Sequence, residues 1–442
     1  MATFLSTPRD WPQVLTGRVA SLAADSADLD GAVRAGAFDA LRTAVRDLGA
    51  TGTIATIAAS GLRGRGGAGF PTGEKWRACA AQPSGQRYVV ANGYGADPGV
   101  QTDAALLAAD PYGVIEGLAI AAFAVGASEA ILAVRADDPA LVARLEAAVA
   151  AAGEAGFLGF DVLGSGHDIA LTVRTVQGAY MLGEETVLLK ALESRRGQPE
   201  QRPPYPTESG LFGRPTVVNN VQTLAAVPWI LKHGAAAYAA IGAKASPGTM
   251  LVQVRGPEGA GIAEVPLGTP LRALVDLAGG TGSRGLKAVL VGGPTGGLLP
   301  ADLLDTPYEF DALRAVGAHV GSGSVVVADD RACIVDLARL LTRFSADEAC
   351  GKTIPCRIGL RRLYEIGERV TSGRPKPTDA ALLTDLAHDV AASALCDHER
   401  LATLAFTSGM RYFRSELDDH LLRSSCPAGV CHPIAVAARV AN

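Results

Sequence analysis

The chain has 442 residues, of which 48% are hydrophobic and 19% are charged, and its net charge is −5 at pH 7. This length predicts two to four domains, and the composition excludes a largely disordered chain. A net charge this small on a large surface gives no indication of a nucleic-acid-binding protein.

The N-terminal region has the residue spacing of helices. Apolar residues recur every three or four positions in "GAVRAGAFDALRTAVRDL" (31–48), which predicts helical structure over residues 1 to about 55. The first residues, "MATFLSTPRDW", lack the basic start and apolar core of a secretory signal. We therefore expect a cytoplasmic protein, free or peripheral to a membrane complex.

The most apolar stretch lies at residues 115–134. It contains Glu116, Glu129 and several small residues, which favours a helix followed by a strand over a membrane span. No direct membrane insertion is expected.

The rest of the chain changes character twice. Residues 95 to about 235 alternate apolar strand-like runs with helical patterns, which predicts an α/β architecture. Residues 248–330 carry short β-rich runs between Gly-Pro turns, and helical patterns dominate from residue 331. We predict an α/β domain with N-terminal helices (1–240), a small β-rich domain (245–330) and a helical domain (331–442).

A glycine-rich loop, "GLRGRGGAGFPTGEKW" (61–76), contains six glycines in sixteen residues. Closely spaced glycines allow consecutive backbone amides to converge on an anion, and Arg65 and Lys75 add positive charge. The spacing fits neither a P-loop nor a clean G-x-G-x-x-G turn. A flexible linker is the other interpretation, but Phe70, Pro71 and Trp76 are bulky residues that linkers seldom carry.

This loop resembles the flavin loop of the NADH-oxidising flavoprotein subunit of respiratory complex I, a module that also occurs in NAD-linked formate dehydrogenases and soluble hydrogenases. Three more stretches match in order and spacing: "GAYMLGEETVLLKALE" (178–193), "RPPYPTESGLFGRPTVVNNVQT" (202–223) and "ACGKTIPCRIG" (349–359). The resemblance covers nearly the whole chain. It implies a Rossmann-like FMN- and NADH-binding α/β domain, a ubiquitin-like domain of the SLBB type, and a C-terminal helical bundle with an iron–sulfur site.

The resemblance also implies the residues of the cofactor site. Those around FMN are Gly64, Arg65, Gly66, Gly67, Ala68, Lys75, Asn92, Tyr180, Gly183, Glu184, Val218, Asn219, Asn220 and Thr223. Those around NAD(H) are Phe70 on the nicotinamide side, together with Asp97, Glu185, Arg202 and Tyr205. Without the resemblance, two adjacent acids opening a helix could simply favour the helix dipole. NADH is favoured over NADPH, because no additional basic residue is evident for a 2′-phosphate.

One part of the flavin region departs from the family. After Asn92 the family carries Asp and then Glu, whereas this chain has Tyr94 and Gly95. The loss of two carboxylates should raise the potential of a bound flavin, because negative charge disfavours its anionic reduced form. Alternatively, Tyr94 blocks the flavin or nicotinamide position, or it stacks on a bound ring.

Six of the seven cysteines follow residue 330, which argues against scattered structural thiols. In "ACGKTIPCRIG" the family has C-x-x-C-x-x-C with a fourth cysteine about forty residues on. Cys350, Cys356 and Cys396 match the first, third and fourth ligands, and Thr353 replaces the second. Three thiolates suit a [3Fe–4S] cluster, or a [4Fe–4S] cluster with one labile iron near the Thr353 hydroxyl. An empty loop with three inert thiols is the other interpretation.

A second group of cysteines lies near the C-terminus, in "SSCPAGVCHP" (424–433). Cys426 and Cys431, with His420 before them and Cys333 further upstream, offer soft ligands suited to zinc or a small cluster. Incidental cysteines in a Pro-Gly loop are the alternative.

These observations predict an electron-transfer subunit of a multi-subunit oxidoreductase. It would move hydride between NADH and FMN, and single electrons through an iron–sulfur cluster to partner subunits. The resemblance implies a small thioredoxin-like [2Fe–2S] partner and a larger iron–sulfur or catalytic subunit. The alternative is a paralogue of the same fold that has lost the cluster or NADH oxidation and serves a structural or regulatory role.

Overall fold

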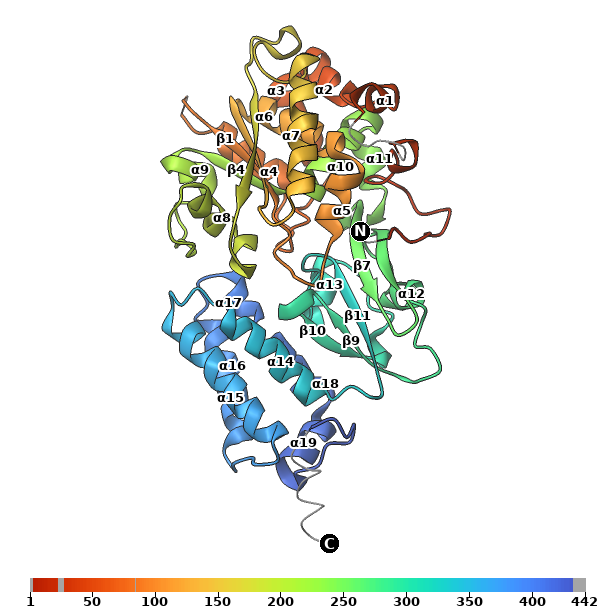
Figure 1. Ribbon diagram of the computed structural model, residues 1–442, viewed down its shortest axis with the longest axis vertical. Coiled ribbons are helices and arrows are strands. Elements are labelled where there is room, and N and C mark those ends of the chain that lie inside the picture. The colour runs from red at the N-terminus through yellow and green to blue at the C-terminus, as the bar shows by residue number, and fades with distance from the viewer. Residues whose placement is uncertain (1–2, 23–27, 84, 432–442) are drawn as a thin grey trace. The chain divides into compact units, whose positions relative to one another are not determined.

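The computed structural model describes residues 3–22, 28–83 and 85–431 (Figure 1). The chain divides into two compact units. The first comprises Met1–Val252 and Ile262–Gly268, and the second comprises Gln253–Gly261 and Thr269–Asn442.

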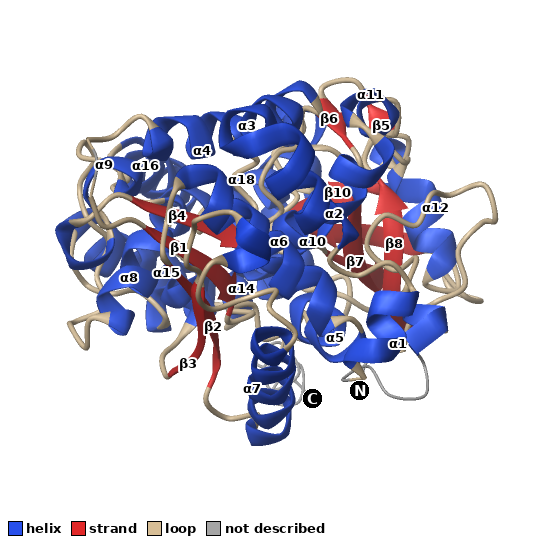
Figure 2. Cartoon of the chain, turned by 90° about the horizontal axis from the view of Figure 1, so that it is seen from above, coloured by secondary structure: helices blue, strands red, loops and turns tan. Residues whose placement is uncertain are grey.

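The first unit is built around a parallel sheet with the strand order β3-β2-β1-β4 (Figure 2). Its strands are β1 (Tyr88–Gly93), β2 (Glu129–Arg135), β3 (Ala170–Val176) and β4 (Thr216–Asn220). Two very short strands, β5 (Gly242–Ala243) and β6 (Ser246–Pro247), form a separate antiparallel pair. The prediction of an α/β architecture is confirmed for this part of the chain.

Eleven helices accompany this sheet in the described part of the first unit. They are α1 (Leu29–Arg34), α2 (Asp39–Thr43), α3 (Gly49–Ala59), α4 (Thr72–Ala80), α5 (Thr102–Ala109), α6 (Pro111–Val125), α7 (Pro139–Glu154), α8 (Glu185–Leu192), α9 (Pro206–Ser209), α10 (Val221–His233) and α11 (Ala235–Ala239).

Helix α6 forms the centre of this unit, and all of its residues are buried. An Asp-Pro pair begins it, because the Asp110 carboxylate accepts a hydrogen bond from the Gly113 amide and Pro111 needs no amide partner in the first turn. Gly117 allows α10 to approach closely, since a Cβ at this position would lie 2.0 Å from the Leu224 carbonyl oxygen. The predicted sequence of helix and strand over residues 115–134 is therefore confirmed by α6 and β2.

The N-terminal region is helical in shorter pieces than its spacing suggests. Phe38 adopts a left-handed conformation with φ of 64°, and Gly49 has φ of 65°, so the backbone turns at both points. A β-branched or bulky residue is uncommon in that region of φ, so the apolar spacing alone could not reveal the break at Phe38.

The second unit combines a small sheet with a helical region. In the sheet, β9 (Leu286–Val291) pairs antiparallel with β10 (Gly297–Pro300) and with β11 (Ser324–Asp329). Residues 253–255 of β7 (Thr249–Arg255) pair in parallel with β11, and β8 (Ala260–Pro266) follows β7 along the chain. Its helices are α12 (Leu271–Leu277), α13 (Phe310–Ala315), α14 (Ile334–Asp347), α15 (Leu360–Thr371), α16 (Asp379–Ala392), α17 (Asp397–Leu401), α18 (Leu404–Tyr412) and α19 (Arg414–Arg423).

The helical character predicted from residue 331 onward is confirmed. Helices α14, α15 and α18 contribute apolar side chains to one core, among them Ile334, Leu363 and Phe406. The pattern "MRYFRSELDDHLLRSS" is divided between α18 and α19, which meet at Phe413.

A membrane-spanning helix needs both length and high hydropathy. Across residues 3–22, 28–83 and 85–431, no single helix is long and apolar enough to cross a membrane. The pair α5 and α6 meets the length and composition criteria only when the two are taken together, and they are bent by 97° relative to each other.

A buried carboxylate ties the N-terminal segment to the body of the first unit. Glu264 is 4% exposed and accepts hydrogen bonds from the amides of Val14, Leu15 and Thr16 at 2.7, 2.8 and 2.9 Å. The hydroxyls of Thr16 and Thr249 also donate to it. Five donors satisfy this acceptor, so removing its charge would leave buried amides poorly paired.

We predict that Glu264→Gln lowers the free energy of unfolding by about 2 to 4 kcal/mol, because a charged acceptor is lost and an NH₂ group faces other donors. Denaturant unfolding of the full chain measures this change. Glu146→Gln is the matched control, since Glu146 is exposed on α7. Equal stability of the two variants would contradict the role given to Glu264.

Candidate functional site

The site lies at the carboxyl ends of β1 and β4. Strands β2 and β3 extend the sheet on one side of β1 and β4 on the other, so the strand order reverses between β1 and β4. Crevices at such reversals bind ligands in open α/β sheets. Asn92 lies near the end of β1, and Asn219 and Asn220 end β4, so three predicted residues meet at this edge.

The glycine loop docks against the same edge. The Arg65 amide donates to the Thr223 hydroxyl at 2.8 Å, and the Trp76 indole donates to the Asn219 side chain at 2.9 Å. A Cβ on Gly66 would lie 3.4 Å from the Cβ of Asn220. The loop and the start of α10 are therefore in direct contact.

Part of the loop backbone is available to a ligand. Within the described part of the chain, the amides of Gly66, Gly67 and Ala68 donate to no protein acceptor. Gly66 and Ala68 are exposed, and Gly67 has φ of 107°, which a side chain would strain. Successive free amides on a glycine-rich turn fit a phosphate group.

The Arg65 side chain points into the protein. It is 1% exposed, and its guanidinium donates to the carbonyl oxygens of Arg63, Pro247 and Thr249 and to the Tyr238 hydroxyl. Burial is the main cause of the lowered pKa of this guanidinium. The expected positive charge beside the phosphate is therefore not supplied by this side chain, and a contact of Arg65 with a cofactor would come from its backbone.

A network of charged side chains forms at the start of α8. The Lys75 ammonium lies 2.8 Å from the Glu185 carboxylate and donates to the Val218 carbonyl at 3.1 Å. Arg202 contacts Glu184 at 2.5 Å and Glu185 at 3.1 Å. The predicted residues from four segments of the sequence thus share one network.

The two adjacent glutamates of this network have different environments. Burial raises the pKa of Glu184, whose carboxylate also caps α8 through the Val187 amide at 2.9 Å. Burial also acts on Glu185, but Lys75 and Arg202 outweigh it and lower the pKa of that carboxyl. The helix-dipole interpretation therefore describes Glu184, whereas Glu185 mainly serves as a partner of two cations.

Tyr94 is 3% exposed and packs within the protein. Its hydroxyl donates to the Gly178 carbonyl at 2.7 Å, and its ring lies 5.1 Å from the Arg135 guanidinium. Asn92 donates to the Leu182 carbonyl at 3.1 Å. The two side chains therefore hold the segment that contains Tyr180 and Gly183 near the end of β1.

The remaining predicted residues differ in exposure. Phe70 and Tyr205 are 50% and 52% exposed, and the Lys75 ammonium lies 5.9 Å from the Phe70 ring. Asp97 is buried and accepts from the Gly99 amide at 2.9 Å. Gly64 donates to the Phe70 carbonyl at 2.8 Å, which closes the loop on itself.

Asp103 belongs to this site but was missed by the sequence analysis. It accepts hydrogen bonds from Asn220 at 2.7 Å and from Gln222 at 2.8 Å, and burial raises its pKa to about 6. Its only signal in the sequence is an acid in the first turn of a helix, which is common without any function.

The iron–sulfur motif forms part of the second unit. Cys350 follows α14, Cys356 lies in a π-helical turn at Pro355–Gly359, and Cys396 precedes α17. Burial raises the pKa of the Cys356 thiol to about 12, with further contributions from the nearby Glu399, Cys396 and Cys350. The structure therefore brings the three predicted thiols into one neighbourhood.

Thr353 has a partner that the sequence did not reveal. Its hydroxyl donates to the Glu399 carboxylate at 2.9 Å, and the other oxygen of Glu399 accepts from the Leu395 amide at 2.9 Å. Glu399 is 1% exposed. An oxygen-rich corner thus lies where the family has a cysteine.

The second group of cysteines also comes together. The ligand atoms of Cys333, His420, Cys426 and Cys431 all lie within 4.8 Å of one another. His432, which follows them in the sequence, lies outside the described residues.

The fold and these sites define a class of protein: a flavin-binding α/β protein with an attached iron–sulfur region. The family model described as "Nuo51 FMN-binding domain" matches residues 57–229, and the one described as "NADH-ubiquinone oxidoreductase-F iron-sulfur binding region" matches residues 336–420.

Curated proteins and solved structures agree with this class. The chain is 40% identical to the NADP-reducing hydrogenase subunit HndC of Solidesulfovibrio fructosivorans, over 84% of this chain and 76% of that protein. It is 37% identical to an F-type NADH-quinone oxidoreductase subunit of Rhizobium meliloti (strain 1021), over 89% and 94%. A crystal structure of NAD⁺-reducing [NiFe]-hydrogenase in the H₂-reduced state matches with a TM-score of 0.83 and 31% identity, over 100% of this chain and 72% of that one. The chain belongs to the family of F-type NADH-quinone oxidoreductase subunits and related hydrogenase subunits.

Proposed function

We propose that this chain is the NADH-oxidising, electron-transfer flavoprotein subunit of a multi-subunit oxidoreductase. The convergence of the glycine loop, Lys75, Glu185 and Arg202 at the strand-order reversal is the observation that carries the proposal. Bound FMN would supply the conversion between the two-electron chemistry of NADH and single-electron transfer.

The residues around FMN divide into three tasks. The amides of Gly66, Gly67 and Ala68 bind the phosphate, supported by the charge of Lys75. Thr223 and Asn219 hold the glycine loop and the start of α4 against β4 and α10, Asn92 holds the segment around Leu182, and Asn220 holds α5 through Asp103. These contacts together shape the space for the flavin. Gly64, Arg65, Tyr180, Gly183, Glu184 and Val218 complete the surroundings, with Arg65 acting through its backbone.

The residues around NADH lie on the exposed side of the network. Phe70 offers an accessible aromatic face for the nicotinamide, and Tyr205 offers one for the adenine. Glu185 and Arg202 bind the ribose and phosphates, and we assign Asp97, which is buried, to the same cofactor. Two cations next to Glu185 keep it ionised, which suits an acceptor for ribose hydroxyls.

The iron–sulfur site takes three thiolates and an oxygen. Cys350, Cys356 and Cys396 bind three irons of a [4Fe–4S] cluster, or all the irons of a [3Fe–4S] cluster. The Thr353 hydroxyl donates a hydrogen bond to the Glu399 carboxylate. Because a carboxylate is charged and a hydroxyl is neutral, Glu399 is the stronger oxygen ligand for a fourth iron. Such an iron is held less firmly than by a thiolate.

The remaining parts of the proposal concern organisation. We assign cofactor binding to residues 1–240, an SLBB-type ubiquitin-like domain to 245–330 and the iron–sulfur region to 331–442. The partners are a small thioredoxin-like [2Fe–2S] subunit and a larger iron–sulfur or catalytic subunit. We place the protein in the cytoplasm, free or peripheral to a membrane complex. A paralogue without electron transfer is not favoured, because free loop amides and three neighbouring thiols are retained.

The glycine loop gives the first test. We predict that Gly66→Leu abolishes FMN binding without unfolding the chain, because its backbone is unstrained and its Cβ meets only the Asn220 side chain. Flavin content after purification is measured by absorbance. Gly153→Leu is the matched control, since Gly153 is exposed and has no neighbour within 4 Å of its Cβ. Full flavin occupancy in Gly66→Leu would refute the assignment.

The charged network gives the second test. We predict that Arg202→Gln raises the KM for NADH about tenfold and leaves FMN content unchanged, because one charge-assisted contact is worth about 1.5 kcal/mol. Stopped-flow bleaching of the flavin measures this effect, and Arg195→Gln on the exposed surface is the control. An unchanged KM would argue against Arg202, and no bleaching of the unmodified protein by NADH or NADPH would make Tyr94 the next residue to vary.

The pair of Thr353 and Glu399 gives the third test. We predict that Thr353→Cys slows iron loss during mild oxidation and that Glu399→Gln accelerates it several-fold, because a thiolate binds iron more firmly and a neutral amide less firmly than a carboxylate. Iron analysis and the EPR signal of the oxidised [3Fe–4S] form measure the loss. Asp385→Asn, on the exposed face of α16, is the control. No iron in anaerobically purified protein, and no gain from Thr353→Cys, would show an empty loop.

A further inference from the structure

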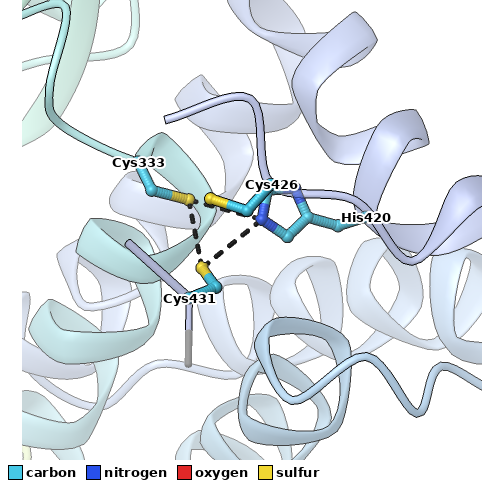
Figure 3. A group of neighbouring side chains, drawn as sticks. All are labelled: Cys333, His420, Cys426 and Cys431. Carbon is cyan, nitrogen blue, oxygen red and sulfur yellow. Dashed lines mark hydrogen bonds between the residues drawn. The ribbon is translucent and has the colours of Figure 1, made fainter. Parts of the chain in front are cut away.

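The second group of cysteines is arranged as a closed metal site in the structure (Figure 3). Cys333 caps the start of α14, His420 lies on α19, and Cys426 and Cys431 follow α19 in a turn closed by the Gly429 amide and the Cys426 carbonyl at 3.0 Å. Cys333, His420 and Cys431 are 3%, 0% and 7% exposed. Three segments of the chain therefore deliver four ligands to one buried point.

The spacing of the ligand atoms fits a single ion. The Cys333 and Cys431 sulfurs are 3.6 Å apart, and Nε2 of His420 lies 3.4 and 3.5 Å from them. A tetrahedral zinc ion, with Zn–S of about 2.3 Å and Zn–N of about 2.0 Å, separates two sulfurs by about 3.8 Å and sulfur from nitrogen by about 3.5 Å. The three separations match those between ligands of one tetrahedral ion, and the Cys426 sulfur lies within 4.8 Å of each of the other three ligand atoms. The Cys333 and Cys431 sulfurs are too far apart for a disulfide of about 2.05 Å.

The neighbours of His420 prepare it as a ligand. Its Nδ1 lies 2.8 Å from the Glu416 carbonyl, which only accepts, so Nδ1 carries a proton. Nε2 therefore faces the sulfurs as the nitrogen that a metal ion would bind. The Glu416 carboxylate in turn accepts from the Ile334 amide at 3.0 Å and pairs with Lys287 at 2.8 Å. Glu416 thus positions His420 and the residue that follows Cys333.

From this geometry we propose that Cys333, His420, Cys426 and Cys431 bind one structural Zn²⁺ ion. Four protein ligands leave no open position, so the ion is neither catalytic nor a step in electron transfer. It joins the start of α14 to the end of α19 and to the chain that follows. Helix α14 has 14 residues and extends about 21 Å, and Cys350 of the proposed cluster comes three residues after its end.

Metal analysis of the full-length protein tests the proposal. We expect one zinc per chain, lost in Cys431→Ser and in His420→Ala while FMN and iron remain. Cys350→Ser should show the converse result, with iron lowered and zinc retained. His388→Ala on the exposed face of α16 is the control for removal of a histidine. Zinc-loss variants should also unfold at lower temperature and be cleaved sooner after α19 by added protease.

Two further measurements guard against misfolded variants. Cys426→Ser changes the least buried of the four ligands, so it should fold and bind zinc more weakly, with release to a chelator at least tenfold faster. X-ray absorption at the zinc edge should give three sulfur neighbours and one nitrogen neighbour. Iron at this site, a Cys333–Cys431 disulfide found by mass spectrometry, or zinc that survives both Cys431→Ser and His420→Ala would overturn the proposal.

Discussion

The flavin site depends on the burial of one guanidinium. Arg65 sits in the middle of the glycine loop, and its side chain satisfies three backbone carbonyls and the Tyr238 hydroxyl inside the protein. Burying an arginine is costly unless its donors are paired, so this set of contacts allows the loop essentially one position. The Arg65 side chain thus anchors the loop whose next three amides, at Gly66, Gly67 and Ala68, donate to no acceptor in the described part of the chain.

The same edge of the sheet balances negative and positive charge within the protein. Lys75 and Arg202 lower the pKa of Glu185 despite its burial, whereas burial raises the pKa of Asp103 to about 6. The family's two carboxylates after Asn92 are absent, and Tyr94 there ties down the Gly178 carbonyl instead. With fewer fixed negative charges near the ring, we expect a lower electrostatic cost of adding electrons to a flavin at this site.

The sequence predicted those features that depend only on residues close together along the chain. Alternating apolar runs predicted the parallel strands, and the glycine loop predicted a backbone that approaches a ligand. The contacts that it could not predict join distant residues: Thr353 with Glu399, Asp103 with Asn220, and the Arg65 guanidinium with Pro247. Each depends on the direction of a side chain after folding, which the spacing of residues does not encode. The positive φ of Phe38 was also unpredictable from the sequence, because tertiary packing outweighs the preference of a bulky residue for negative φ.

The second unit contains two groups of three cysteines, Cys333, Cys426 and Cys431 in one and Cys350, Cys356 and Cys396 in the other. The arrangement of the ligand atoms suits a different metal centre in each group. In both groups a non-thiol group completes the set: the imidazole of His420 in one, and the oxygens of Thr353 and Glu399 in the other. The histidine group converges on a point, as one ion requires, and imidazole nitrogen together with thiolate sulfur suits zinc. The other group offers the hard carboxylate of Glu399 in place of a fourth thiolate, so an iron bound at that position would be held least firmly. Cys333 caps α14 at its start, and Cys350 follows three residues after its end, so the redox-inert ion anchors one end of the helix whose other end leads into the redox site.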